Sequence, residues 1–200
     1  MTNRQRGRPR AFDEGVVLDR ALDAFWAAGY EATSLDDLAA ATGLARASIY
    51  AAFDNKETLY LRTLERFAER MSAIFQESFA RGAPLVDALT GFYLKSIALY
   101  FSGNQPRGCL AMCTAAASAV NEPVVRAALA ASLQSIDDAL AQAFRRAQSA
   151  GDLSPKVDAG IRARLASAAL QSIALRARAG EARRSVEKFA RETARFLCTP

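Results

Sequence analysis

Histidine is absent from this chain of 200 residues, and cysteine occurs only three times. Because histidine is the commonest general base and metal ligand of proteins, its absence excludes most catalytic triads and zinc sites. It also excludes a helical-bundle di-iron enzyme, which needs paired Glu-x-x-His motifs. Three cysteines are too few, and odd in number, for a disulfide framework. We therefore expect a protein that is not an enzyme, with no catalytic residue, no metal and no cofactor.

Long apolar segments are missing as well. No run approaches the length of a membrane span, and residues 1–20 lack the apolar stretch of a secretory signal peptide. Hydrophobic residues nevertheless make up 51% of the chain and charged residues 24%, which is the balance of a domain with a buried core. These features predict an ordered, cytosolic protein.

The positive net charge of +5 is distributed unevenly along the chain. Residues 1–10 carry four arginines and no acid, whereas residues 11–60 carry three basic and nine acidic side chains. Residues 161–200 are basic again, with nine basic and three acidic side chains. Bulk charge therefore does not locate a nucleic-acid site, and only the positions of individual cations can do so.

Helical periodicity dominates the chain. Leu18, Ala21, Leu22 and Phe25 follow the i, i+3, i+4, i+7 pattern, and no segment alternates with period two for long enough to predict a strand. The sequence predicts an all-α fold of about nine helices. After three short N-terminal helices, longer ones are expected at about residues 55–80, 85–102, 108–120, 123–150, 157–179 and 182–197.

The stretch ATGLARASIYAAFDNK, residues 41–56, is unusual because its helix is barely two turns long. Gly43 supplies a turn residue that is free to take positive φ, and Ala39 is small where a second helix would cross. Ser34 with Asp37 resembles a capping box at the start of the helix before the glycine turn. Asp54 with Glu57 resembles one at the start of the long helix that follows. Two short helices joined by a glycine turn and preceded by a third predict a helix-turn-helix. A generic helical hairpin would share the glycine turn, but it would not need this whole ordered series of capping, small and turn residues.

Residues 29–60, GYEATSLDDLAAATGLARASIYAAFDNKETLY, resemble the DNA-binding region of TetR/AcrR-type transcriptional regulators. The resemblance is specific over residues 13–60, and beyond residue 60 it rests on the helix layout. It implies a basic arm over residues 1–12, a helix-turn-helix DNA-binding domain over 13–55, and a ligand-binding and dimerisation domain over 56–200. One departure from the family pattern is Ala45, which stands where Ser or Thr usually caps the recognition helix.

The resemblance also implies a role for individual residues of the helix-turn-helix. Thr33, Tyr50 and Lys56 would bind backbone phosphates, since phosphate contacts position the protein on the duplex. Arg46, Ala47 and Ser48 would face base edges in the major groove. Of these three, only Arg46 can make a bidentate contact to guanine. If these residues do not bind DNA, Tyr50 would be a half-buried packing residue and Arg46 a solvated cation.

The N-terminal arm contains the segment RGRPR, with Arg6, Arg8 and Arg10. It resembles an AT-hook core, in which proline keeps the backbone extended and arginines enter a narrow minor groove. The alternative is a disordered basic tail. Because the arm is tethered directly to the helix-turn-helix, we predict that it binds DNA.

Cys109 and Cys113 lie four residues apart, so they would share one face of a helix. Two small apolar residues in a core are the simpler interpretation. The alternative is an oxidant or electrophile sensor at Cys109, with Arg107 lowering the thiol pKa. The Gly-Cys-Leu at this place resembles an element of one subgroup of the family, in some members of which the cysteine is the sensing residue.

The remaining expectations follow from the family resemblance. Residues 157–197 would form a four-helix bundle with a second subunit, giving a homodimer on a pseudo-palindromic operator of double-stranded DNA. The expected function is a repressor released by a small-molecule effector, with a transcriptional activator or a thiol-based sensor as alternatives. The pocket residues would be apolar or aromatic side chains at helical spacing: Phe67, Met71, Phe75, Phe92, Tyr93, Ile97, Tyr100 and Cys113.

Overall fold

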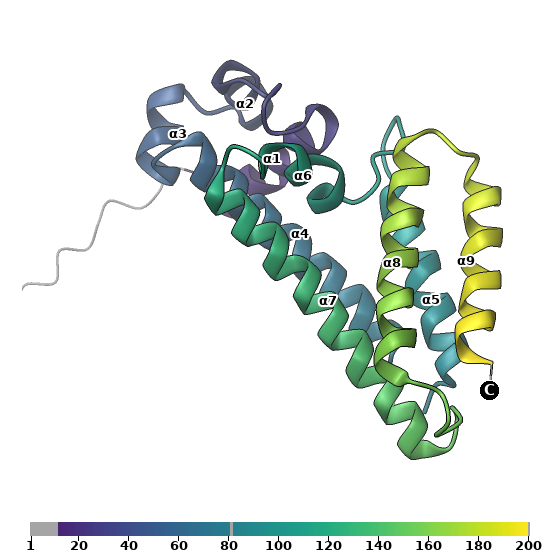
Figure 1. Ribbon diagram of the computed structural model, residues 1–200. Helices are drawn as coiled ribbons and strands as arrows, with labels where there is room; N and C mark the ends of the chain where they lie inside the picture. The colour runs from purple at the N-terminus through teal and green to yellow at the C-terminus, as the bar shows by residue number, and fades with distance from the viewer. Residues whose placement is uncertain (1–11, 81, 200) are drawn as a thin grey trace, which may run out of the picture.

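A computed structural model describes residues 12–80 and 82–199. Within these residues the chain folds into nine α-helices and one π-helical turn, with no strand, which confirms the predicted all-α class. Figure 1 shows a head of short helices at one end and a body of long helices at the other. The arginines of the arm, Arg6, Arg8 and Arg10, lie outside the described residues.

The head consists of α1 (Glu14–Ala28), α2 (Leu35–Thr42) and α3 (Arg46–Phe53). Asp13 caps α1, since its carboxylate accepts the backbone N–H groups of Gly15 and Val16. The inward sides of the three helices meet in one core, where Phe25, Leu38 and Ile49 are fully buried. The predicted amphipathic sides of the short helices therefore face each other.

Helix α4 (Lys56–Ser78) joins the head to the body. It packs against α1 in the head and against α5 and α7 in the body, and Figure 1 shows it running alongside α7. Leu59, Leu64 and Phe67 are buried on its inner side. A movement of α4 would thus shift side chains that it contacts in both the head and the body.

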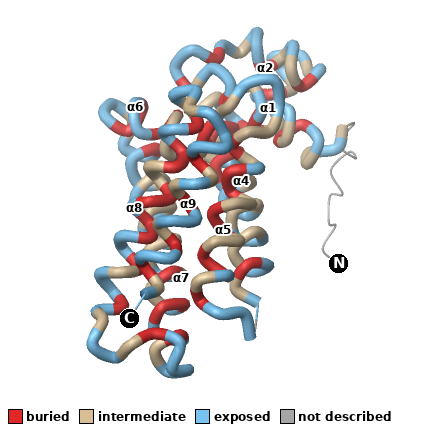
Figure 2. The backbone as a smooth tube through the Cα atoms, turned by 90° about the vertical axis from the view of Figure 1, so that its right-hand side faces the viewer, coloured by how far each residue is buried: buried red, intermediate tan, exposed pale blue. Residues whose placement is uncertain are grey.

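The body is built from α5 (Leu85–Tyr100), α7 (Pro123–Ala150), α8 (Ala159–Arg178) and α9 (Arg183–Cys198). Helix α8 packs against both α7 and α9, and α5 packs against α9. In Figure 2, buried and exposed positions alternate along these helices, as they do when each helix buries one side. Their bounds lie within about two residues of those the periodicity predicts.

The predicted helix at about 108–120 is present but is shorter and not regularly α-helical. The structure has a π-helical turn, η1 (Ala111–Ala115), followed by the short α6 (Ala116–Ser118). The Thr114 hydroxyl donates to the Leu110 carbonyl oxygen over 2.6 Å and also bonds to the Tyr60 hydroxyl of α4. A side chain that occupies a helix carbonyl competes with the backbone ladder, and single π turns often occur at functional sites.

Candidate DNA-binding surface and effector pocket

The turn between α2 and α3 has the geometry that the helix-turn-helix requires. Gly43 has φ 74° and ψ 14°, the left-handed conformation, and its N–H donates to the Ala39 carbonyl oxygen over 2.9 Å. Glycine adopts this conformation without the steric cost of a Cβ atom. The chain therefore reverses sharply and leaves the N-terminus of α3 free to approach a ligand.

The two helices on either side of this turn differ in their N-terminal caps. Ser34 and Asp37 form a reciprocal capping box at α2, with Ser34 N–H to Asp37 Oδ2 at 2.8 Å and Asp37 N–H to Ser34 Oγ at 3.1 Å. Ala45 occupies the cap position before α3 and provides no side-chain cap, as the sequence indicates. Helix α3 is instead held by the buried side chains of Ile49 and Phe53. Its first N–H groups have no side-chain acceptor of their own.

The outer side of α3 carries the predicted base-reading residues. Ala47 is exposed, Ser48 is half-buried and Tyr50 is 48% exposed. Arg46 is exposed too, but its guanidinium makes a bidentate ion pair with the Asp36 carboxylate of α2, with Nε 2.6 Å from Oδ1. This geometry suits Arg46 to a planar, two-pronged acceptor. To contact a base, Arg46 must first leave Asp36.

Lys56 is the first residue of α4, and its ammonium lies 4.5 Å from the centre of the Tyr30 ring. A cation at this place is both near solvent and fixed by an aromatic face. The sequence placed the cap of α4 at Asp54, which is wrong by one residue. Asn55 is the cap, since its Oδ1 accepts the Thr58 N–H over 2.7 Å.

Asp54 instead occupies a tight turn between α3 and α4. It has φ 68° and ψ −56°, and the Asn55 N–H donates to the Phe53 carbonyl oxygen over 2.8 Å, which together define a γ-turn. This conformation is strained for a residue other than glycine. It turns the chain so abruptly that Tyr50 and Lys56 stay within the same small region of the head.

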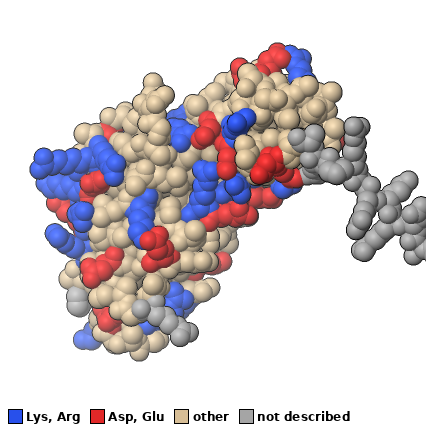
Figure 3. All heavy atoms as spheres, turned by 180° about the vertical axis from the view of Figure 1, so that it is seen from behind, with Lys and Arg blue, Asp and Glu red and all other residues tan. Residues whose placement is uncertain are grey.

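Thr33, the remaining predicted phosphate-binding residue, is buried before α2. It is 1% exposed, and its hydroxyl donates to the Gly29 carbonyl oxygen over 2.6 Å. In this conformation Thr33 closes the turn between α1 and α2. Over the head, acidic and basic side chains lie interspersed on the face seen in Figure 3, in keeping with the acidic balance of residues 11–60.

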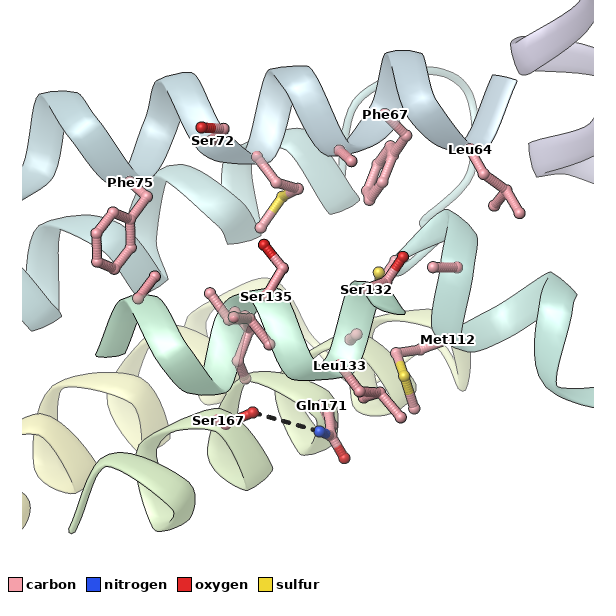
Figure 4. A pocket seen from close by; sticks show the side chains of 18 of the residues that line it. Leu64, Phe67, Ser72, Phe75, Met112, Ser132, Leu133, Ser135, Ser167 and Gln171 are labelled. Carbon is pink, nitrogen blue, oxygen red and sulfur yellow. Dashed lines mark hydrogen bonds between the residues drawn. The ribbon is translucent and has the colours of Figure 1, made fainter. Parts of the chain in front are cut away.

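A cavity of about 160 Å³ lies in the body between α4, α7, α8 and η1. Figure 4 shows Phe67 and Leu64 of α4 on one side of it, Ser132, Leu133 and Ser135 of α7 on the other, and Ser167 and Gln171 of α8 beyond them. Of the residues predicted to line a pocket, Phe67, Met71, Phe75 and Tyr100 do so. A cavity of this kind, with a mostly apolar wall and a few polar groups, is the usual form of a small-molecule site.

The other predicted pocket residues lie outside this cavity. Phe92 packs against Phe75 and Phe79, and the Tyr93 hydroxyl donates to the Ala166 carbonyl oxygen over 2.8 Å. Ile97 is fully buried, and Cys113 packs beside Gly108. These positions point inward, as periodicity predicts, but they meet other side chains rather than open space.

Sequence reasoning missed the polar residues of the cavity wall. Ser132 interrupts the inward side of α7, and Ser167 and Gln171 do the same in α8, whereas Ser135 lies exposed at the edge of the cavity. The Gln171 amide donates to Ser167 Oγ at the long distance of 3.5 Å, drawn as the dashed line of Figure 4. Polar side chains at positions where a packed helix should be apolar are the signal that would have found them.

Cys109 lines the cavity, but not with the chemistry that the sensor hypothesis assumed. Burial raises the pKa of its thiol to about 11, so the thiol is protonated at neutral pH. Arg107 does not activate it, because its guanidinium stacks 4.0 Å from the Trp26 ring centre and pairs with Asp23 at 2.6 Å. Among the described residues, no group of three or more His, Cys, Asp or Glu side chains could hold a metal ion.

Polar contacts link the segment around the cavity wall to the head and to α4, and two of them involve buried aromatic side chains. The Trp26 indole N–H of α1 donates to the Gly108 carbonyl oxygen over 2.9 Å, next to Cys109 in the chain. The Tyr60 hydroxyl of α4 lies 2.7 Å from Thr114 Oγ1 of η1. The Tyr60 ring in turn packs 4.9 Å from that of Tyr30. Since Tyr30 holds Lys56, this second contact leads from η1 to a predicted phosphate-binding residue.

Helix α8 exposes apolar side chains along one stripe. Ile161 is 61% exposed, Leu165 is 48% exposed and Leu175 is 52% exposed. Their spacing of four and ten residues places them on one helical face. On α9, the neighbouring helix, Phe196 is 70% exposed. Contiguous apolar side chains in contact with water are typical of an interaction surface. No helix in the described part of the chain is both long and apolar enough to cross a bilayer.

Two family profiles match the chain over most of its length. Residues 17–63 match the one described as bacterial regulatory proteins, tetR family, and residues 82–193 match a tetracyclin repressor-like C-terminal domain. The chain belongs to the TetR family of bacterial regulatory proteins. This confirms the family that the sequence resembles, and with it the N-terminal helix-turn-helix and the C-terminal helical domain.

Individual TetR-family relatives align over about three quarters of the chain or more. The HTH-type transcriptional repressor ComR of Escherichia coli K12 is 29% identical over 194 residues, covering 96% of this chain and 92% of ComR. The uncharacterised regulator YezE of Bacillus subtilis is 26% identical over 74% of this chain and 76% of its own length. A cysteine-substituted variant of the TetR family regulator CifR, solved on a 26-base-pair operator, is 28% identical with a TM-score of 0.84. That match covers 94% of this chain and 98% of CifR.

Proposed function

We propose that this TetR-family protein is a repressor that binds a pseudo-palindromic operator as a homodimer and leaves it when a small molecule enters the body. One observation carries the proposal. A helix-turn-helix with an exposed second helix and an apolar cavity share one connecting helix, α4. The repressor name of ComR and the operator complex of CifR support it as properties of relatives. The protein would act on cytoplasmic DNA, without catalytic activity.

In this proposal α3 enters the major groove. Arg46 exchanges the Asp36 carboxylate for the two acceptors of a guanine, while Ala47 and Ser48 lie against neighbouring base edges. Tyr50 and Lys56 bind phosphates on either side of the groove, where the N-terminus of α4 adds favourable backbone N–H groups. The arm, including Arg6, Arg8 and Arg10, follows the adjacent minor groove.

Dimerisation would use the apolar stripe of α8 and its neighbour α9. Two copies packed through residues 157–197 give a four-helix bundle and cover Ile161, Leu165 and Phe196. A dimer places its two α3 helices one helical turn of DNA apart, or a multiple of it. The dimer can therefore bind both half-sites of a pseudo-palindromic operator at once.

Release would follow from a change in the spacing of the two α3 helices. A ligand in the cavity touches α4 directly through Phe67 and Met71, and touches η1 through Met112. Helix α4 packs against α1 of the head, and η1 bonds to α4 through Thr114 and Tyr60. If the ligand-bound form holds the heads at another spacing, the ligand must lower operator affinity by the free energy that separates the two forms.

Selection of duplexes from a random library by the full-length protein, followed by anisotropy titration, tests the proposal. Wild type should enrich a two-fold sequence. Arg46→Ala should lose about 1–3 kcal/mol of discrimination at one base pair in each half-site. Lys56→Ala should weaken binding to all sequences and reduce the salt dependence. Lys95→Ala, which removes a cation of the body paired with Glu77, is the matched control and should bind as wild type. Enrichment of no sequence by the wild-type dimer would contradict the proposal.

A thiol trigger at Cys109 is the alternative, favoured by the position of its side chain in the cavity wall. It shares the DNA-binding head and differs only in what releases it. Treatment with a mild oxidant should release wild type but not Cys109→Ser if the thiol is the trigger. If the oxidant affects operator binding of the two proteins equally, reversible ligand binding remains as the trigger. Whether the bound protein represses or activates is decided by a reporter gene placed behind the selected operator.

A further inference from the structure

The cavity is electrically neutral. None of the described residues that line it is charged, although lysine, arginine, aspartate and glutamate make up 24% of the chain. Its wall is formed by aliphatic, aromatic and methionine side chains with hydroxyl and amide groups between them. A bound ion would lose its hydration there without gaining an opposite charge, which is strongly unfavourable. The wall therefore selects against carboxylates, phosphates and ammonium ions.

One polar group in this wall has no partner. Tyr100 is fully buried at the end of α5, and among the described residues its hydroxyl makes no hydrogen bond. The other two fully buried tyrosines do bond, Tyr60 to Thr114 Oγ1 at 2.7 Å and Tyr93 to the Ala166 carbonyl oxygen at 2.8 Å. A buried hydroxyl without a partner destabilises a protein, so it calls for an explanation.

The protonation state of Tyr100 decides which partner it needs. Burial raises the pKa of Tyr100 well above its ordinary value of 10, so the hydroxyl keeps its proton at neutral pH. The Cys109 thiol lies close enough to interact with the hydroxyl and contributes to this shift, but the contact does not reach the geometry of a hydrogen bond, and sulfur is only a weak acceptor. A protonated phenol with an unused proton is a donor, and what it lacks is an acceptor.

The volume of the cavity limits the size of the occupant. At about 160 Å³ it is similar to an engineered apolar cavity of about 150 Å³ that binds benzene. A single ring with a short substituent fits this space. A larger molecule would extend out of this space toward solvent, where the lining residues Ser72 and Ser135 are exposed.

We propose that the effector of this protein is an uncharged, mainly apolar molecule of about one-ring size whose oxygen accepts a hydrogen bond from Tyr100. The proposal rests on the function proposed above and adds the chemical class of the effector. An aromatic ketone or aldehyde has the required chemistry. Its ring lies against the aliphatic wall and its carbonyl oxygen supplies the acceptor that the Tyr100 hydroxyl lacks.

Three probes of similar shape separate the features of this class: acetophenone, ethylbenzene and benzoate. Binding to the full-length protein is measured by calorimetry, with wild type, Tyr100→Phe and Tyr93→Phe as the matched set. Because the ketone is better hydrated than the hydrocarbon, the informative quantity is the ratio of their affinities within each protein. The ratio should fall about fivefold in Tyr100→Phe, as expected for one hydrogen bond. It should stay unchanged in Tyr93→Phe, whose hydroxyl lies outside the cavity.

The infrared carbonyl band of bound acetophenone gives a second measurement that needs no variant. In wild type the band should lie at lower frequency than in an apolar solvent, because the carbonyl accepts a hydrogen bond. An unshifted band, or an affinity ratio that does not change in Tyr100→Phe, would overturn the role of Tyr100. Benzoate binding as tightly as acetophenone would overturn the neutral class.

Operator titrations of the same proteins keep this test separate from that of the proposed function. If wild type binds its selected duplex but neither neutral probe, the effector class is wrong and the regulator remains. If acetophenone binds but does not weaken operator affinity, the cavity chemistry is right and ligand release is wrong. The predicted result is that acetophenone lowers operator affinity in wild type, with a smaller effect in Tyr100→Phe.

Discussion

The head and the body of this protein are built by different means. In the head, helix ends are fixed by neighbours in the chain: Asp13 and Ser34 accept first-turn N–H groups, and Gly43 takes a left-handed turn. In the body, α5, α7 and α9 begin without any side-chain cap. These helices are long enough to be held by the side chains that they bury. Helices α1 and α2 of the head thus rely on local caps, whereas the uncapped helices of the body rely on packing between distant segments. The division is not complete, since α3 has no side-chain cap and Asp158 caps α8.

The two regions also differ in the groups that they present. The head presents charged and polar side chains to solvent, whereas the body encloses a cavity without a charged wall. Polar contacts such as Trp26 with Gly108 and Tyr60 with Thr114 join them. A signal from a neutral ligand to a charged surface must cross this junction, so substitutions there should separate the stability of each region from their communication.

The largest effect is expected from Gly108→Ala, at the junction itself. Gly108 has φ 66°, and an added Cβ would lie 2.8 Å from Cys113 Sγ and would collide with the Ala174 carbonyl oxygen. The backbone oxygen cannot move aside without shifting α8, so stability should fall by about 2–5 kcal/mol. Thermal unfolding measures the loss. Gly151→Ala is the control for positive φ alone, since it has φ 87° but nothing within 4 Å. An equal loss in both variants would show that crowding at Gly108 is not the cause.

The next effect is expected from Tyr60→Phe, which removes the hydroxyl that meets Thr114 Oγ1. Stability should fall by about 1 kcal/mol, the usual net value of one buried hydrogen bond. The more informative result concerns communication: the weakening of operator binding by acetophenone should shrink, while the affinity for each partner alone changes little. Trp26 is the single tryptophan and is fully buried at the junction, so its emission reports the contact directly. A response as large as in wild type would show that Tyr60 does not carry the signal.

Within the head, Ala45→Ser tests whether the missing cap matters. A hydroxyl at this position can accept a first-turn N–H of α3, and the resulting gain should be about 0.5–2 kcal/mol. Operator binding should persist. The control is Ser34→Ala, which removes an existing cap of α2 and should lower stability by a similar amount. A melting temperature unchanged or lowered by Ala45→Ser would mean that α3 is already as ordered as α2.

The sequence predicted the head better than the cavity, and the reason is physical. Ser34, Asp37 and Gly43 act on backbone groups within four residues, so their roles are visible in the chain itself. Even there, Asp54 and Asn55 both suit a cap, and only the γ-turn at Asp54 decides that Asn55 is the one used. Local signals therefore fix the identity of an element more firmly than its first residue.

The cavity depends on contacts that no local pattern carries. Periodicity predicts that Phe67 and Phe92 both point inward, but not that only Phe67 meets open space. Thr114 of the π turn η1 meets the hydroxyl of Tyr60, which is 54 residues away in the chain. Likewise, Arg107 stands next to the Gly108–Cys109 pair in sequence but turns toward Trp26. Such outcomes are settled by packing and cannot be read from spacing.

The smallest effect is expected at the ion pairs that tie α1 to α4. Hydrogen bonding from Arg66, with the charges of Arg66 and Arg70, lowers the pKa of Asp19 below its usual value of 3.8. A carboxylate whose pKa is lower in the folded state stabilises the protein above its unfolded pKa and loses that contribution as pH falls through the folded pKa. Asp19→Asn should therefore cost less than about 1 kcal/mol at pH 7, because the pair is partly exposed.

The pH dependence distinguishes this ion pair from a packing effect. The difference in unfolding free energy between wild type and Asp19→Asn should shrink as pH falls below about 4 and should vanish once Asp19 is protonated. Glu187→Gln, which removes a pair with Arg183 within α9, is the control and should leave the contact between α1 and α4 unchanged. A deficit of Asp19→Asn that persists in acid would assign the effect to the shape of the side chain. In that case Asp19 would join α1 to α4 through the packing of its side chain and not through its charge.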